Sequence, residues 1–265
     1  MSEPTVVCCD LDGVLWRGDD PIPGASAAVG TMRGAGLRVA FLTNNSSGTV
    51  EDYLAKLRHM GVDAGAHDLM TSAMAAADLL AGTLSSGARV LACAGAGVVE
   101  ALEHAGFDVV QRAPADAVVV GWHRTFDFDG LARAVDAIRS GARFVATNTD
   151  PTYPVPGGVL PGNGAIVAAV ATAARRRPEV AGKPERATVE MVRRRLGERG
   201  VVVGDRPSTD GALAAALGWP FAMVLSGIGG AGGEEGVPDP PPRWVADDLQ
   251  SLARTLVSGL RAAAG

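Results

Sequence analysis

Short apolar runs rich in β-branched residues alternate along the chain with longer, alanine-rich stretches. This alternation is typical of βα units around a mostly parallel sheet, and it predicts an α/β fold with a Rossmann-like core. Strands are expected at residues 5–9, 37–42, 89–93, 117–120, 143–147, 200–203, 221–225 and 244–246. Helices are expected near residues 25–33, 50–59, 72–80, 97–105, 131–139, 164–174, 187–196, 210–217 and 248–260. The glycine- and proline-rich segment 226–242 is expected to be a loop.

The composition of the 265 residues restricts the partners of the protein. Apolar residues make up 47% of the chain and charged residues 20%, so it can build a sizeable core. The net charge of -5 argues against a broad nucleic-acid surface, which needs a basic footprint. Any small anion must therefore be held by a local site.

The sequence predicts neither secretion nor membrane insertion. The first five residues lack the basic and apolar segments of a signal peptide, and the apolar stretch 165–174 is shorter than the ~20 residues that cross a bilayer. The three cysteines, Cys8, Cys9 and Cys93, form no disulfide framework, and the first two are expected on opposite faces of one strand. We therefore expect a cytoplasmic protein without membrane or nucleic-acid partners.

Two aspartates follow the first predicted strand, in the order Asp10-Leu11-Asp12-Gly13. Ligands of open parallel sheets bind at the carboxyl edge of the strands, which is where both carboxylates fall. Concentrated negative charge is costly there unless a cation neutralises it, and oxygen ligands favour a hard ion such as Mg²⁺. A calcium-type turn or ordinary turn chemistry remains the alternative.

Polar residues also follow other predicted strands. Thr43, Asn44 and Asn45 come after strand 37–42, where their hydroxyl and amide groups form either a neutral phosphate cradle or a helix cap. The two interpretations are compatible. Lys183, in a turn before Pro184, is either a surface charge or a cation that offsets Asp10 and a phosphoryl group.

Two further acids follow the strand at 200–203. Asp205 is placed to complete a metal site with Asp10, because both residues come directly after apolar strands. Asp210, near a predicted helix start, is expected to cap that helix or to support the site rather than to bind the metal directly.

Taken in order, these motifs resemble the haloacid dehalogenase (HAD) superfamily of aspartyl-phosphate phosphatases, over almost the whole chain. The resemblance is closest to subclass IIA, which comprises nitrophenylphosphatase-like, phosphoglycolate and glycerol-3-phosphate phosphatases. The segments that carry it are 43–46, 71–73, 147–151, 160–165, 182–184 and 204–206.

The resemblance implies a role for each motif. Asp10 would be the nucleophile, and Asp12 the general acid and then the general base. Mg²⁺ would be bound by Asp10, the backbone carbonyl of Asp12 and Asp205. The residues that hold the phosphoryl oxygens would be Thr43, Asn44, Asn45 and Lys183.

The resemblance also implies an architecture. Residues 1–84 and 178–265 would form the catalytic core, and residues 85–177 an inserted, smaller α/β cap domain. The cap segment 148–162, with Asn148 and Asp150, is expected to face the active site. A homodimer is expected by analogy with caps that pair in relatives.

The expected substrate is a small phosphorylated metabolite, with glycerol 3-phosphate favoured and phosphoglycolate or a sugar phosphate as alternatives. The cap segment Trp122-His123-Arg124 stands where relatives more often carry a Leu-Asp-type pair after the glycine, which leaves substrate choice and the roles of His123 and Arg124 open. A phosphotransferase or mutase is a rival within enzymes. A non-enzymatic, receiver-like phosphate-binding module is a rival from another class, although a mere phospho-acceptor has no need of Asp12.

Overall fold

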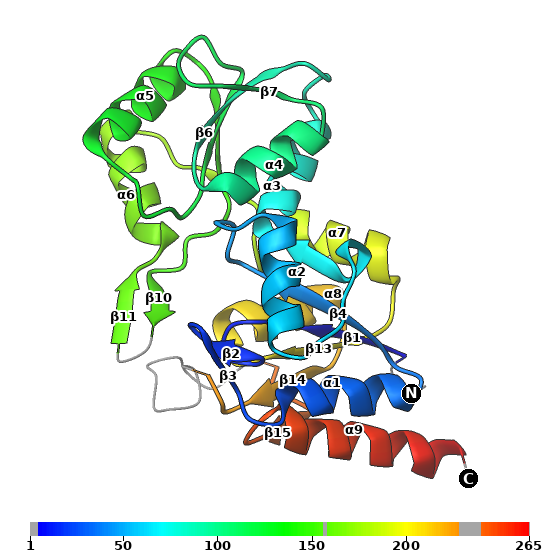
Figure 1. Cartoon of the computed structure of the whole chain (residues 1–265). Helices are drawn as coiled ribbons and strands as arrows, with labels where there is room; N and C mark the ends of the chain where they lie inside the picture. Colours follow the sequence, from blue (N-terminus) through cyan, green and yellow to red (C-terminus); the bar gives the residue numbers. More distant parts are fainter. Residues whose placement is uncertain (1–4, 156–157, 228–239, 265) are drawn as a thin grey trace.

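The computed structural model describes residues 5–155, 158–227 and 240–264, which form two stacked α/β units (Figure 1). The lower unit contains a six-stranded sheet in the order β15-β14-β13-β1-β4-β5, in which every pair is parallel. Its strands are β1 (Val6–Cys9), β4 (Arg38–Thr43), β5 (Leu69–Thr71), β13 (Val201–Gly204), β14 (Phe221–Val224) and β15 (Trp244–Ala246). The predicted α/β class with a parallel-sheet core is confirmed.

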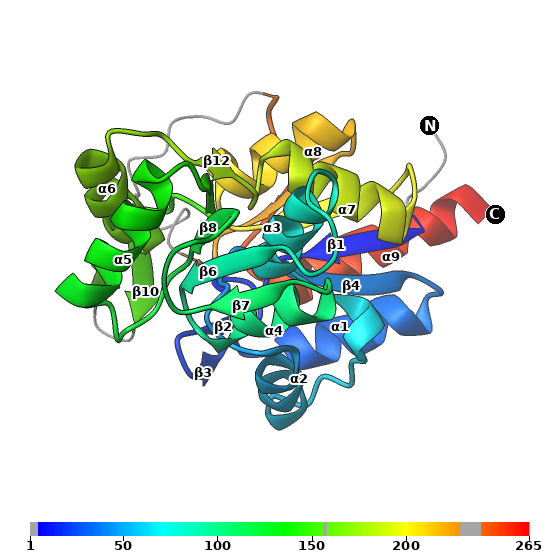
Figure 2. The ribbon, with the colours of Figure 1, turned by 90° about the horizontal axis from the view of Figure 1, so that it is seen from above.

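The upper unit contains a five-stranded parallel sheet in the order β12-β9-β8-β6-β7. Its strands are β6 (Arg89–Cys93), β7 (Asp108–Val110), β8 (Ala117–Val120), β9 (Arg143–Ala146) and β12 (Glu179–Val180). Seen from above, this sheet lies over the lower unit (Figure 2). The division into a core and a cap at residues 85–177 stays a prediction, and β12 lies just beyond that range.

The helices connect and cover the strands of both sheets. They are α1 (Ala25–Gly34), α2 (Val50–His59), α3 (Ser72–Ala81), α4 (Ala96–His104), α5 (Phe128–Arg139), α6 (Asn163–Ala174), α7 (Arg186–Leu196), α8 (Ala212–Leu217) and α9 (Leu249–Ala264). The start of α2 is fixed by a capping box, in which Thr49 and Asp52 bond each other's backbone N–H groups. In the described part of the chain, no helix combines the length and the apolar character needed to span a membrane.

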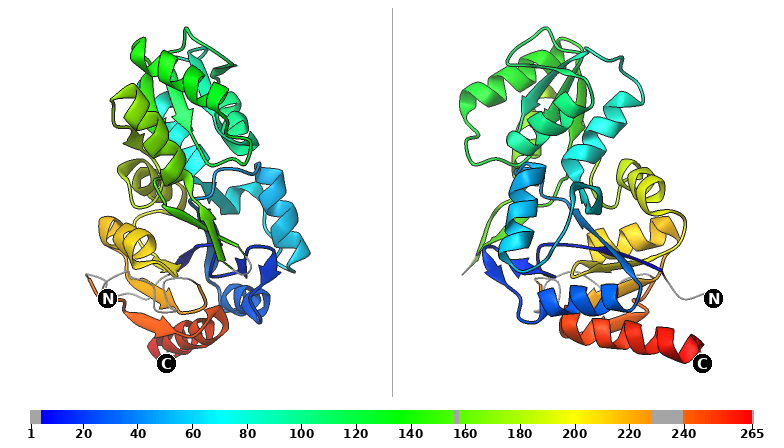
Figure 3. Two further views of the ribbon diagram at one scale, coloured as in Figure 1. Left: turned by 90° about the vertical axis from the view of Figure 1, so that its left-hand side faces the viewer. Right: turned by 45° about the vertical axis from the view of Figure 1, so that its right-hand side comes forward.

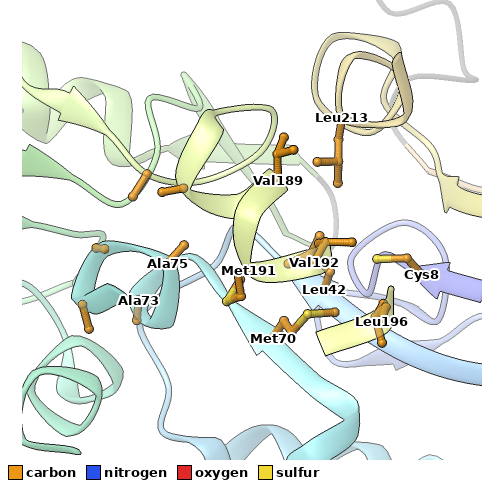
Figure 4. Close-up of a cluster of buried hydrophobic side chains, with 14 of the residues drawn as sticks. Cys8, Leu42, Met70, Ala73, Ala75, Val189, Met191, Val192, Leu196 and Leu213 are labelled. Atoms are coloured by element: carbon orange, nitrogen blue, oxygen red, sulfur yellow. The ribbon is translucent and has the colours of Figure 1, made fainter. Parts of the chain in front are cut away.

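Alternate residues of β1 enter different cores, as expected for a strand buried on both sides. Cys9 packs in the cluster beneath the sheet, which α1, α2 and α9 complete. Cys8 belongs to a cluster on the other side, together with residues of α7 and α3 (Figure 4). That second cluster continues to Val90 and Val98 of the upper unit, so the two sheets share one apolar core. The predicted placement of the two cysteines is confirmed.

Two short antiparallel hairpins complete the fold. One pairs β2 (Trp16–Arg17) with β3 (Asp20–Pro21), and the other pairs β10 (Thr152–Val155) with β11 (Gly158–Pro161). The β10–β11 hairpin extends from the upper unit toward the lower one (Figures 1 and 3). Residues 228–239 of the predicted 226–242 loop lie outside the described residues.

Candidate active site

The site lies where β1, β4 and β13 end. Because β1 pairs in parallel with both neighbours, the residues that follow these strands share one edge of the sheet. Asp10 follows β1, Thr43 is the last residue of β4, and Asp205 follows β13. Asp210 comes from the π-helical turn (Pro207–Gly211) that connects β13 to α8. All four side chains are buried.

Lys183 lies at the centre of this group. Its Nζ is 2.8 Å from Oδ1 of Asp10 and 2.7 Å from Oδ1 of Asp210, and the lysine is only 5% exposed. Asn44 holds the lysine backbone from two sides: Lys183 N–H donates to Asn44 Oδ1 at 2.7 Å, and Asn44 Nδ2 donates to the Lys183 carbonyl at 3.2 Å. The ammonium is therefore placed by the fold and is not a mobile surface charge.

The charged side chains of this group shift one another's pKa values. Burial raises the pKa of Asp10 well above its usual range, Lys183 opposes that rise, and Asp210 and Asp205 add to it. Burial alone would lower the pKa of Lys183, but Asp10 and Asp210 more than offset this and raise it. Lys183 therefore keeps its positive charge. What destabilises the site is the burial of several carboxylates close to one another around the lysine.

The acidic cluster fits a divalent cation. Asp10, Asp205 and Asp210 each offer a carboxylate oxygen, and these atoms lie within 4.8 Å of one another. Lys183 offsets one of the three negative charges, and a divalent ion would offset the other two. Hard oxygen donors are the ligands that Mg²⁺ prefers. Gly13, at φ 80°, allows the close packing, since a Cβ there would lie 2.6 Å from Asp205 Oδ2.

Asp210 accepts hydrogen bonds through both of its carboxylate oxygens. Its Oδ1 accepts from Lys183, and its Oδ2 accepts from the backbone N–H of Arg206 at 3.2 Å. The supporting role expected for Asp210 stays a prediction, since its carboxylate also belongs to the acidic cluster.

Comparison with known proteins adds to this geometry. The family model described as haloacid dehalogenase-like hydrolase matches residues 7–108, and a second, HAD-hydrolase-like model matches residues 180–252. The D-glycerol 3-phosphate phosphatase of Mycobacterium tuberculosis is 41% identical over 255 residues, which cover 95% of this chain and 71% of the relative. This chain belongs to the haloacid dehalogenase-like hydrolase family.

Solved structures agree with that assignment. A structure of the mycobacterial glycerol phosphate phosphatase in complex with magnesium has a TM-score of 0.85 and 39% identity, covering 96% of this chain and 78% of that one. The p-nitrophenyl phosphatase of Archaeoglobus fulgidus has a TM-score of 0.87 and 28% identity, covering 96% and 100%. The acid sugar phosphatase of Staphylococcus aureus is 34% identical over 231 residues, 86% of this chain and 89% of the relative. The resemblance inferred from the motifs is thus confirmed.

In this HAD-like hydrolase, Asp12 lies beside the acidic cluster rather than within it. Its Oδ1 accepts a hydrogen bond of 3.0 Å from the indole N–H of Trp16. Burial raises the pKa of Asp12, while Lys56 and the Trp16 bond oppose the rise. The carboxyl group lines the same cavity as Asp10 and Thr43.

The residues of the predicted phosphate cradle lie in a polar segment at the end of β4. The Thr43 hydroxyl accepts from Asn45 N–H at 3.0 Å, which bends the loop. Asn44 Nδ2 also lies 3.2 Å from Oδ2 of Asp150, and the Asn44 carbonyl accepts from Asn148 Nδ2 at 2.6 Å. Asn148 and Asp150 therefore reach the site from the upper unit.

A cavity of about 140 Å³ opens above these residues. The hairpin residue Tyr153 stacks on Trp122 with ring centroids 4.6 Å apart, and Trp122 donates to the Pro161 carbonyl at 2.9 Å. Both rings and Arg17 line the cavity. Sequence reasoning missed Arg17 and Tyr153, although Tyr153 falls in the segment 148–162 expected to face the site.

Among the described residues that line the cavity, neither His123 nor Arg124 occurs. The ring of His123 bonds the Gly121 carbonyl at 2.9 Å and meets Phe126 edge-on. Arg124 lies with its guanidinium carbon 6.0 Å from the centroid of the Trp122 ring. Arg124 thus lies next to a ring that lines the cavity, whereas the contacts of His123 are with Gly121 and Phe126.

Proposed function

We infer that this protein hydrolyses a small phosphomonoester through a phosphoryl group carried on Asp10. The observation that supports this most is the pairing of Asp10 with Lys183 at the floor of a cavity, beside two further buried carboxylates. The family and the phosphatase names of the relatives agree with it.

Each residue has a role that its position supports. Asp10 would attack phosphorus, and Lys183 with the Thr43 loop would hold the phosphoryl oxygens. Asp12 would give its proton to the leaving oxygen and then take one from the water that attacks the aspartyl phosphate. Mg²⁺ held by Asp10, the Asp12 carbonyl and Asp205 would supply positive charge facing the same oxygens.

The favoured substrate is glycerol 3-phosphate. The basis is the mycobacterial relative that is named for this substrate, together with a cavity suited to a small leaving group. Phosphoglycolate or a sugar phosphate is the alternative, and the staphylococcal relative is named as an acid sugar phosphatase. We place the catalytic core at residues 1–84 and 178–265 and the cap at 85–177, with the cap selecting the leaving group.

A panel of phosphomonoesters tests this proposal. The panel holds glycerol 3-phosphate, phosphoglycolate, sugar phosphates and p-nitrophenyl phosphate, and phosphate release is followed with Mg²⁺ and with a chelator. Asp10→Asn should lower kcat on the order of 10⁴-fold or more, whereas Asp108→Asn, an exposed carboxylate on β7, should not. Substantial activity of Asp10→Asn, or a phosphoprotein as the best substrate, would refute the proposal.

A further inference from the structure

Trp16 donates a side-chain hydrogen bond to Asp12, and it does so from inside the protein. Its indole N–H lies 3.0 Å from Asp12 Oδ1, and the residue is only 1% exposed. Among the described residues that line the cavity, Asp12 and Arg17 occur but Trp16 does not. Any effect of Trp16 on the reaction must therefore pass through Asp12.

The turn after β1 places the indole. Leu15 N–H donates to the Leu11 carbonyl at 2.8 Å, and Gly13 N–H donates to the Trp16 carbonyl at 2.7 Å. These bonds curl the chain so that Trp16, four residues after Asp12, lies beside it as β2 begins. The ring is then packed in the apolar cluster beneath the sheet, which fixes its orientation.

Lys56 of α2 secures the other side of the ring. Its ammonium lies 4.6 Å from the Trp16 ring centroid and donates to the Gly18 carbonyl at 2.6 Å. A cation on the face of an indole is attracted to the ring and draws electron density from it, so the N–H becomes a stronger donor. The lysine also holds down the β2–β3 turn, where it lies 3.5 Å from Asp19.

We propose that Trp16, supported by Lys56, is a positioning residue that fixes the rotation of the Asp12 carboxyl group relative to the cavity. An indole nitrogen can donate but cannot accept. Oδ1 is therefore the acceptor of this bond, and the bond restricts rotation of the carboxyl group. This rests on the proposed function, in which Asp12 is the general acid.

The leaving group provides the kinetic test. An alkoxide needs a proton from Asp12 to depart, whereas p-nitrophenolate departs with little help. Trp16→Phe, which keeps an aromatic ring but removes the donor, should lower kcat/KM for glycerol 3-phosphate by roughly 10- to 100-fold and for p-nitrophenyl phosphate by less than about threefold. Equal losses for the two substrates, or no loss, would overturn the proposal.

A matched control is available in the lower unit. Trp219 is also buried, and its indole N–H donates to the Glu198 carbonyl at 2.9 Å. Trp219→Phe removes the same atoms far from Asp12, so any loss should be equal for both substrates. If Trp16→Phe does not fold, Lys56→Met keeps the indole and should give a smaller loss with the same substrate selectivity; an unselective loss would contradict the proposal.

A readout independent of activity uses the indole N–H signals of the four tryptophans in a proton–nitrogen NMR spectrum. Trp16→Phe identifies one signal by its disappearance. Asp12→Ala should shift that signal and leave the Trp219 signal in place, and an unshifted Trp16 signal would overturn the contact. If the wild type hydrolyses neither substrate, the proposed function fails, while the spectra still decide whether Trp16 holds Asp12.

Discussion

Replacing Lys183 by methionine should destabilise the protein strongly. At an effective dielectric constant of about 20, charges as close as Lys183 and each of its two partner carboxylates attract by about 6 kcal/mol before hydration is counted. The hydration that the buried lysine has given up offsets much of this gain. Breaking a buried pair by removing one partner nevertheless costs about 3–5 kcal/mol, because the remaining charges stay buried. Asp10 and Asp210 are the carboxylates left in this position.

The assay is thermal unfolding in a chelator and in Mg²⁺. A loss of 3–5 kcal/mol should lower Tm by roughly 6–20 °C for a chain of this size. Added Mg²⁺ should recover part of that loss, since the cation replaces some of the missing positive charge. Activity should fall in both media.

The chain contains two lysines, so the matched control is Lys56→Met. Lys56 is half-buried, and its ammonium bonds one carbonyl and pairs with the exposed Asp19. Its loss should cost only about 1 kcal/mol. If Lys183→Met were as stable as Lys56→Met in the chelator, Lys183 would not be offsetting the carboxylates, and our account of the site would be wrong.

Two further predictions follow from the geometry. Burial raises the pKa of Cys93 to about 11, so at pH 8 only about 0.1% of this thiol is ionised; iodoacetamide should label it slowly in the folded protein, faster as pH rises, and rapid labelling at pH 8 would contradict its burial. Gly13→Ala should cost more stability, and more Mg²⁺ affinity by calorimetric titration, than Gly36→Ala. Both glycines have positive φ, but a Cβ at Gly13 would meet Asp205, whereas nothing lies within 4 Å of a Cβ at Gly36. Equal effects of the two substitutions would show that the Asp205 contact does not matter.

Strands that are unbroken apolar runs could be predicted from the sequence. The strands at 89–93, 117–120 and 244–246 match β6, β8 and β15 to the residue. Most of the strands that were missed contain proline, glycine, aspartate or glutamate, which are depleted in strands. β12 pairs with the sequence-distant β9, whereas the two strands of each hairpin pair with each other.

The predicted site residues were found for a topological reason. Asp10 and Asp205 come after strands that turned out to be neighbours, so their carboxylates had to meet at one edge. Nothing comparable identifies Trp16 or Tyr153. Trp16 contacts Asp12 because of the turn between them, and no sequence motif predicts the shape of that turn. Tyr153 lies on a hairpin that extends to the cavity from the upper unit.

Asn44 connects the lysine of the site to the upper unit. Its side-chain amide bonds both the backbone N–H and the carbonyl of Lys183. The same Nδ2 also donates to the carboxylate of Asp150 in the upper unit. The amide nitrogen carries two N–H donors, so it can bond the Lys183 carbonyl and the Asp150 carboxylate at the same time. One side chain therefore contacts both the backbone of the lysine that lies beside Asp10 and a carboxylate of the upper unit.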